Sequence, residues 1–327
     1  MPLSGVFFIP SNPNTSTALS TVTERLASIF GDEATPTGRW ALEHKLMRDT
    51  PSCLPPSGTQ RPTAPKLMQF LSLTYHPNHG FIYASQPSEA PAPTPAQVTS
   101  TPSSSQSSQQ IPTTPMVMTT VPLASTNSLY QHFSYACQPF WCPRHTVTVP
   151  NGVMYEIGDF RVRVGDVRQT QPAARVRGTV VEVEWRGPSL VGTLSALYQT
   201  RRQKTARANP YTFDNGEDAG DDDSGIDMAF PEGVEEADID SEYAVAASLI
   251  REFWTNLGID GAREAILVPD VGKEAKERLQ LLKQGQGKET RGRIGDDDGS
   301  GLINEDPDPN AGVDVARQFM EILRFNR

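Results

Sequence analysis

The sequence predicts an α+β fold, in which a largely antiparallel, β-barrel-like sheet of about eight strands is flanked by helices. Three observations lead to this prediction. Short β-prone runs bounded by turn residues fill much of the chain up to Trp185, helical periodicity is concentrated beyond Ser241, and the two do not alternate. Without strand–helix–strand alternation, a parallel sheet is not expected. We expect residues 1–327 to form a single domain interrupted by polar inserts.

The chain begins with a predicted strand and helix. Gly5–Ile9 is short, β-prone and followed by proline, which is typical of a strand. Residues 17–30 then switch to helical spacing, Gly31 stands at the expected stop, and Thr15 or Thr17 could cap the start. The apolar stripe of this helix consists of Leu19, Val22, Leu26, Ile29 and Phe30.

A half-buried strand and a hairpin should follow. Residues 38–48 alternate in part, as expected for an antiparallel strand with one buried face. That face carries Trp40, Leu42, His44 and Leu46. Leu67–Tyr75 and Gly80–Ala84 are also β-prone, and the short loop His76–His79 between them predicts a hairpin.

Two polar inserts are expected to be disordered. Residues 86–127 are almost entirely Ser, Thr, Pro, Gln and Ala, whereas residues 214–242 contain thirteen Asp or Glu and no Lys or Arg. Such segments bury too little apolar surface to offset the entropy of ordering, about 1–2 kcal/mol per residue for the backbone. Loops near 51–65 and a flexible segment near 284–310 are predicted for the same reason.

The densest β signal lies between the two inserts. Pro150-Asn151-Gly152 predicts a hairpin turn and Gly158-Asp159 a second tight turn, so neighbouring strands should be antiparallel. The four strands expected here are Thr146–Val149, Val153–Ile157, Phe160–Val164 and Arg177–Trp185.

Helices should complete the fold. Residues 189–200 fit a helix or a strand, and the pattern does not decide between them. Beyond the acidic insert, Ser241 can cap a helix that runs to Leu257 and ends at Gly258, and Glu274–Leu282 is a shorter helix candidate. A final helix is marked by Val313, Ala316, Met320 and Leu323.

Composition narrows the class of protein. The net charge is −10, but thirteen of the 39 acidic residues lie in 214–242, so the rest of the chain is close to neutral. No concentrated basic face is visible, and direct nucleic-acid binding is not expected.

No apolar run approaches the ~20 residues that span a bilayer. Three cysteines do not suggest a disulfide framework, and we expect a soluble protein of a reducing compartment. Arg201-Arg202-Gln203-Lys204 is too short to predict a nuclear import signal.

Two groups of residues have the chemistry of metal ligands. Cys137 and Cys142 lie near His132 and His145, but their spacing is loose and no second cysteine pair exists. Ordinary side chains of a β region are the simpler interpretation. His76 and His79 flank a Pro-Asn turn without an accompanying carboxylate, so exposed loop histidines are favoured.

Glu182 and Glu184 form the most interesting pair. Alternate residues of a strand point the same way, and Arg186 continues that face. Two carboxylates inside a barrel could hold Mg²⁺ or Mn²⁺, with Arg161 and Arg163 as phosphate partners, and E-x-E-x-R faintly resembles the E-x-E-x-K strand of tunnel-type triphosphate metalloenzymes. A metal-dependent phosphohydrolase is therefore the alternative function. The simpler interpretation is that both carboxylates are solvated and paired with arginines across strands, because the apolar residues between them occupy the other face.

The acidic insert is itself a candidate ligand. Apolar residues punctuate it at Ile226, Met228, Phe230, Val234 and Ile239. Acidic stretches of this kind can dock basic partners, so a protein-interaction adaptor is a further hypothesis. A solvated loop is the simpler interpretation.

Several stretches together resemble fungal members of the Mediator subunit 20 family. They are Gly5–Asn14 (GVFFIPSNPN), Gly38–Thr50 (GRWALEHKLMRDT), Tyr155–Arg168 (YEIGDFRVRVGDVR), Ile250–Trp254 (IREFW) and Leu323–Asn326 (LRFN). The likeness reaches both ends of the chain and leaves the two polar inserts outside. The motifs are specific in combination and less so singly.

The resemblance implies a β-barrel-like fold and a stable heterodimer with Mediator subunit 18 in the head module. It implies a nuclear transcription coregulator that links regulators to RNA polymerase II, and contact with TATA-binding protein has been proposed for the family. Neither catalytic residues nor a cofactor are implied. The sequence assigns no residue to a partner interface, and import into the nucleus together with a partner is a hypothesis.

Overall fold

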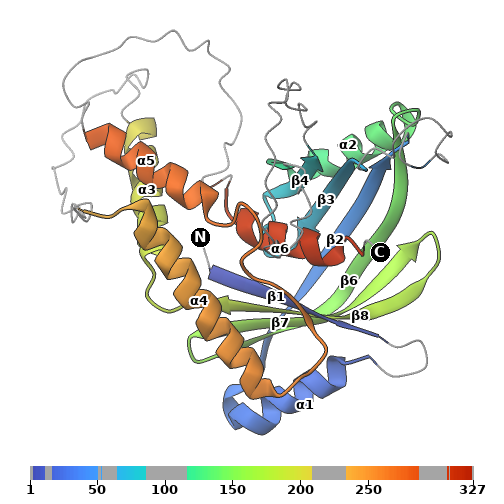
Figure 1. Ribbon diagram of the computed structural model, residues 1–327, viewed down its shortest axis with the longest axis horizontal. Coiled ribbons are helices and arrows are strands. Elements are labelled where there is room, and N and C mark those ends of the chain that lie inside the picture. Colours follow the sequence, from blue (N-terminus) through green and yellow to red (C-terminus); the bar gives the residue numbers. More distant parts are fainter. Residues whose placement is uncertain are drawn as a thin grey trace, which may run out of the picture.

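The computed structural model describes residues 3–11, 17–50, 53, 65–85, 116–207, 233–286, 308 and 310–325 (Figure 1). The strands are β1 (Leu3–Pro10), β2 (Pro36–Asp49), β3 (Leu67–Leu73), β4 (His79–Ser85), β5 (Met116–Pro122), β6 (Trp141–Ile157), β7 (Phe160–Gln171), β8 (Arg175–Trp185) and β9 (Arg263–Ala265). The helices are α1 (Leu19–Phe30), α2 (Leu123–Tyr135), α3 (Leu190–Arg207), α4 (Glu236–Leu257), α5 (Lys273–Gln286) and α6 (Val313–Leu323). A 3-10 turn, Gly31–Glu33, follows α1.

The described strands form one antiparallel sheet of nine strands that is not closed into a barrel. Their order is β5-β4-β3-β2-β6-β7-β8-β1-β9. The sheet curves around α6, which contacts strands at both ends of this order, β5 as well as β9 (Figure 1). The predicted fold class is confirmed, and α6 occupies the space that would be the lumen of a barrel.

Helices cover both faces of the sheet. Side chains alternate along β1, so that Val6 and Phe8 join the cluster around α6, whereas Phe7 points to the other face and stacks on Trp254 of α4 with ring centroids 4.1 Å apart. The cluster on the α4 side also includes Val22 and Leu26 of α1. Because both faces are covered, β8 has no solvated side over most of its length, and this decides the environment of Glu182 and Glu184.

Several predicted elements are confirmed. On β2, Trp40, Leu42, His44 and Leu46 are all buried. β3 and β4 pair as a hairpin, and Gly31 ends α1 with a positive φ. Thr17 does not cap α1, because its hydroxyl donates to Asp166 Oδ2 at 3.0 Å. The alternative cap, Thr15, lies outside the described residues.

β6 is one long strand, so the hairpin predicted at Pro150-Asn151-Gly152 is wrong. These residues lie where the β2–β6 and β6–β7 registers shift. Gly152 faces Trp40, and a Cβ there would lie 2.2 Å from the indole nitrogen. The indole donates to the Val164 carbonyl of β7 at 3.2 Å. Pairing with β2 overrides the local turn preference, and the glycine leaves room for the indole.

The insert predicted over 86–127 is partly structured. β5 begins at Met116, and α2 follows it directly. Tyr130 and Phe133 of α2 pack on Phe70 of β3, with ring centroids 5.5 and 6.2 Å apart. The Met116–Val121 run is apolar and β-branched enough for a strand, but it was assigned to the insert because it adjoins the Ser/Thr/Pro tract. The rest of that tract lies outside the described residues.

The acidic insert also ends earlier than predicted. α4 begins at Glu236, and Glu235 and Asp238 form a capping box, so Ser241 is not the cap. Ile239, predicted to lie in a solvated loop, is fully buried among α3, α4 and α5. The undecided segment, residues 189–200, is helical from Leu190, and the Glu242 carboxylate of α4 accepts from the first backbone N–H groups of α3 at 2.6 and 2.8 Å. The rest of this insert, and most of 51–65 and 284–310, lie outside the described residues.

Candidate functional site

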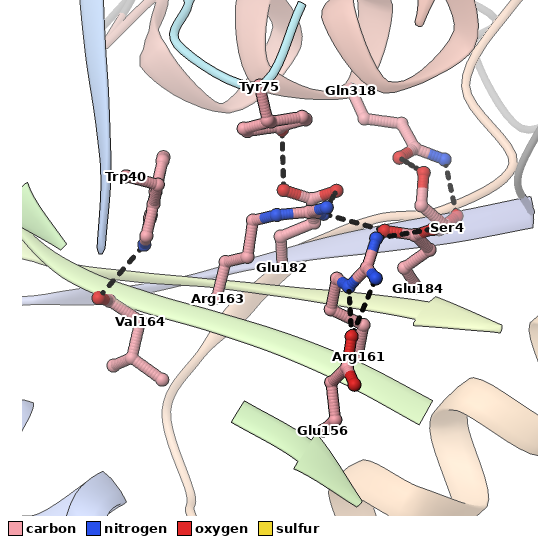
Figure 2. Close-up of polar contacts among 10 residues, drawn as sticks. All are labelled: Ser4, Trp40, Tyr75, Glu156, Arg161, Arg163, Val164, Glu182, Glu184 and Gln318. Carbon is pink, nitrogen blue, oxygen red and sulfur yellow. Dashed lines mark hydrogen bonds and ion pairs between the residues drawn. The ribbon is translucent and has the colours of Figure 1, made fainter. Parts of the chain in front are cut away.

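Glu182 and Glu184 lie on the face of β8 that looks toward α6 (Figure 2). Both are buried, with exposed fractions of 1% and 7%. Val181 and Val183 between and beside them point to the α4 side, as the alternation predicts. The expectation that both carboxylates are solvated is therefore wrong, because α6 and the β3–β4 loop cover this face.

Arg163 of β7 joins the two carboxylates. It lies opposite Glu182 in the β7–β8 register, and its Nη1 is 2.6 Å from Glu182 Oε1 and 2.8 Å from Glu184 Oε2. The Tyr75 hydroxyl donates to Glu182 Oε2 at 2.6 Å, and its ring lies 3.9 Å from the Arg163 guanidinium carbon. Arg161 Nη1 lies 3.7 Å from Glu184 Oε1. The predicted pairing with arginines across strands is confirmed, and each of the four carboxylate oxygens has a donor or cation nearby.

The charges of this network balance locally. Burial raises the pKa of Glu182, and Arg163 acts in the opposite direction. Burial lowers the pKa of Arg163, but Glu182, Tyr75 and Glu184 together outweigh this effect, and the net pKa lies above the ordinary value. Burial, followed by the charge of Glu182, also raises the pKa of Tyr75, so the phenol stays protonated and can donate. Arg163 is thus a permanent cation between two acids.

α6 closes the site. Gln318 donates to the Ser4 carbonyl at 2.6 Å and to the Ile266 carbonyl at 2.8 Å, while the Ser4 hydroxyl donates to Gln318 Oε1 at 2.9 Å (Figure 2). Ser4 lies opposite Glu184 in the β1–β8 register. The helix is therefore hydrogen-bonded in place over the carboxylates. A divalent cation would have to displace Arg163 and Tyr75 from the oxygens that they occupy.

Arg186 does not extend this network. β8 ends at Trp185, and Arg186 pairs at 2.9 Å with Glu156, which also pairs with Arg161 at 2.6 Å. The two ion pairs to Glu156 lie at a partly exposed edge, where solvent limits their contribution to stability.

The cysteines and histidines that were considered as zinc ligands have other contacts. Cys137 and Cys142 are free thiols, and Cys142 Sγ lies 3.3 Å from the Thr50 hydroxyl. His145 Nε2 lies 3.1 Å from the Leu323 carbonyl at the end of α6. Among the residues that the structure describes, no group of three or more His, Cys, Asp or Glu is arranged to hold a metal ion.

The loop histidines are not exposed as predicted. His79 is buried, and its Nε2 lies 2.8 Å from the Ala311 carbonyl. The His76 ring is half-buried against Gly312, where a Cβ would lie 2.3 Å from Nε2. Both side chains pack against the start of α6, a contact between distant parts of the chain that the loop sequence does not indicate.

A second buried charge network, which the sequence analysis missed, ties α6 to α4 and α5. Arg317 Nη1 lies 2.6 Å from Glu274 Oε2 and 3.0 Å from Asp314 Oδ1, and the Tyr243 hydroxyl donates to Asp314 at 2.6 Å. Burial raises the pKa of Asp314, and the hydrogen bond from Tyr243 opposes this. The sequence signal is the spacing of three between Asp314 and Arg317, which places both on one helix face.

Comparison with known families accounts for nearly the whole chain. Residues 1–324 match the family described as TATA-binding related factor (TRF) of subunit 20 of Mediator complex. The chain belongs to this family. Its members are Mediator subunits that act in transcription regulation and are generally non-catalytic, which agrees with the resemblance of the five stretches. No curated protein matches the chain. No helix within the described ranges has the length and apolar character to cross a membrane.

Proposed function

We propose that the chain is a non-catalytic subunit of the Mediator head module, which pairs with subunit 18 and acts as a coregulator of RNA polymerase II in the nucleus. The family match over residues 1–324 carries this proposal. Partners would then bind outer surfaces and sheet edges, because α6 occupies the interior of the curved sheet.

The buried carboxylates favour this proposal over a phosphohydrolase. Glu182 and Glu184 supply no open ligand set, because Arg163 and Tyr75 occupy the Glu182 oxygens and the two arginines flank Glu184. A tunnel-type enzyme also needs a solvent-filled interior, where this fold places α6. Purified chain supplied with a nucleoside triphosphate and Mn²⁺ should release no phosphate above the rate given by the Glu182→Ala variant.

Affinity purification tests the heterodimer. The tagged chain should recover subunit 18 in near-stoichiometric amounts, and the same pull-down probed for TATA-binding protein tests that contact. Recovery of the chain alone, folded and unassociated, would contradict the heterodimer. Microscopy of a fluorescent fusion tests the nuclear location.

A deletion separates this proposal from an adaptor that uses its acidic insert as the ligand. Because Val234 and Ile239 are core residues, the deletion must stop before them, and residues 214–231 are suitable. We expect the heterodimer to survive this deletion. Loss of subunit 18 would instead assign the interface to the acidic insert.

A further inference from the structure

A groove of about 510 Å³ opens at one end of the sheet, beside the end of α6. Its lining comes from β2, β6, β7, β8 and the residues after α6, with Pro65 and Leu67 at one side. The lining contains no Asp or Glu. Its cationic side chains are Arg48, Arg144, Arg175, Arg177 and Arg324. In a domain that is close to neutral, this is a concentrated basic surface, although no basic face is visible in the sequence.

Three of the five arginines, Arg144, Arg175 and Arg177, have no ion pair within the described residues, whereas Arg324 pairs with Glu321 at 3.1 Å. Arg175 donates to the uncharged side-chain amide of Gln169 at 3.2 Å. Guanidinium groups without a carboxylate partner favour a ligand that accepts hydrogen bonds and carries negative charge.

The pKa of His145 reflects the positive charge around it in the groove. Its pKa is lowered to about 4, first by burial and then by Arg177, Arg144 and Arg175, while its hydrogen bond to the Leu323 carbonyl acts the other way. The imidazole is therefore neutral near pH 7, and the positive charge of the groove comes from guanidinium groups. Burial and the charge of Arg175 likewise lower the pKa of Arg177.

Apolar surface lies among the cations. The Phe325 ring lines the groove, with the Arg177 guanidinium carbon 4.8 Å from its centroid, and Leu46 and Leu67 contribute buried apolar walls. A ligand that fits this lining combines acidic groups with apolar ones. Nucleic acid needs a basic track along many phosphates, whereas these arginines gather at one short groove.

We propose that this groove binds an acidic peptide segment of a protein partner. Carboxylates of the segment pair with Arg144, Arg175 and Arg177, and an apolar side chain packs beside Phe325. Arginine clusters suit such recognition because the planar guanidinium can bind a carboxylate through two hydrogen bonds. The groove lies within one chain, so this inference does not depend on the proposed heterodimer.

Fluorescence anisotropy on the full chain tests the proposal. The probe is a labelled peptide of roughly 12 residues in which Asp and Glu alternate with Leu and Phe. Comparison probes carry Asn and Gln in place of the acids, or are single-stranded oligonucleotides of equal charge. We expect the acidic peptide to bind with a salt-sensitive affinity, and both comparison probes to bind at least about tenfold more weakly.

Charge reversal locates the site. Arg144 and Arg175 are exposed, so Arg144→Glu and Arg175→Glu should fold normally and weaken peptide binding by about tenfold or more. The matched control is Arg168→Glu, at an exposed arginine on β7 outside the groove, which should leave binding unchanged. Equal binding of the Asn/Gln peptide, tighter binding of the oligonucleotide, or no effect of charge reversal would overturn the proposal. Binding that emerges only after residues 214–231 are deleted would also overturn it, because the chain's own acids would then be the occupant.

Discussion

Two groups of arginines in this protein have opposite charge environments. Arg163 of β7 is buried, and it lies between two carboxylates and against the ring of Tyr75. The groove arginines, such as Arg144 and Arg175, have no acid among their neighbours in the groove lining. The first group is balanced and closed, and the second is unbalanced and open.

This difference distinguishes charged groups that stabilise the fold from charged groups that can bind a ligand. A buried network whose members are all paired holds elements in one arrangement and leaves nothing for a ligand. Exposed cations without acids contribute little to the fold, and each can pair with an incoming anion. Removing Arg163 should therefore affect stability, whereas reversing Arg144 should affect binding.

The largest loss of stability is expected where a substitution places an unpaired charge in the apolar core. Phe253 of α4 is 5% exposed and its ring lies 5.4 Å from that of Phe30 and 4.7 Å from that of Phe160. Phe253→Asp should lower the free energy of unfolding by more than about 4 kcal/mol, because a carboxylate enters an apolar site. Denaturant titration measures this, with Val245→Asp on the exposed side of the same helix as the control. Unchanged melting would show that this face is open in the free subunit.

The second largest loss of stability is expected on removing Arg163, the cation that Glu182 and Glu184 share. Arg163→Met should lower the free energy of unfolding by about 3 kcal/mol, because it leaves Glu182 and Glu184 buried without their counter-charge. Adding Glu182→Gln should recover part of the loss, since the double variant carries one buried carboxylate fewer. Arg186→Met, outside the buried network, is the control and should change little, because Arg186 pairs with the exposed Glu156. If Arg163→Met costs no more than Arg186→Met, the buried network does not hold the fold together.

The sequence predicted the local parts of both regions but not their surroundings. Strand alternation placed Glu182 and Glu184 on one face and indicated pairing with arginines, as the structure has it. Their burial depends on α6, which returns to cover β8 from far along the chain. No local pattern reports such a contact. In the same way, Pro150-Asn151-Gly152 has the residue types of a hairpin turn, but these residues continue β6 because pairing with β2 dominates.

The groove could not be predicted for a related reason. Arg48, Arg144, Arg175 and Arg324 belong to four separate segments, and they meet because β2 ends, and β6 and β8 begin, near the end of α6. A count of charges along the chain averages them with the acids elsewhere. Net charge therefore described the domain as near neutral and concealed a local excess of arginine.

The free energy of unfolding should depend on pH in the acid range because two histidines have lowered pKa values. The pKa of His145 is lowered to about 4 and that of fully buried His44 to about 3, both chiefly by burial. The unfolded chain, with histidine pKa values near 6.5, binds more protons below that pH, so stability should fall as pH drops from about 6.5 toward 4. The slope contributed by each histidine is at most about 1.4 kcal/mol per pH unit.

Nuclear magnetic resonance can assign this effect to His145. Its ring signals should titrate well below pH 6 in the unaltered chain. Arg144→Glu should raise the pKa of His145, because it replaces a nearby positive charge with a negative one. An unchanged His145 pKa in this variant would mean that Arg144 does not contribute to the field of the groove.

The smallest effect on stability is expected at the groove itself. Arg144→Glu should leave the free energy of unfolding within about 0.5 kcal/mol, or raise it slightly, because the exposed arginine has no acid to lose and two cationic neighbours to relieve. Denaturant titration beside Arg163→Met gives the direct comparison. If Arg144→Glu instead lowers stability by more than about 1 kcal/mol, the groove arginines hold the fold as Arg163 does, and their excess charge does not indicate a ligand.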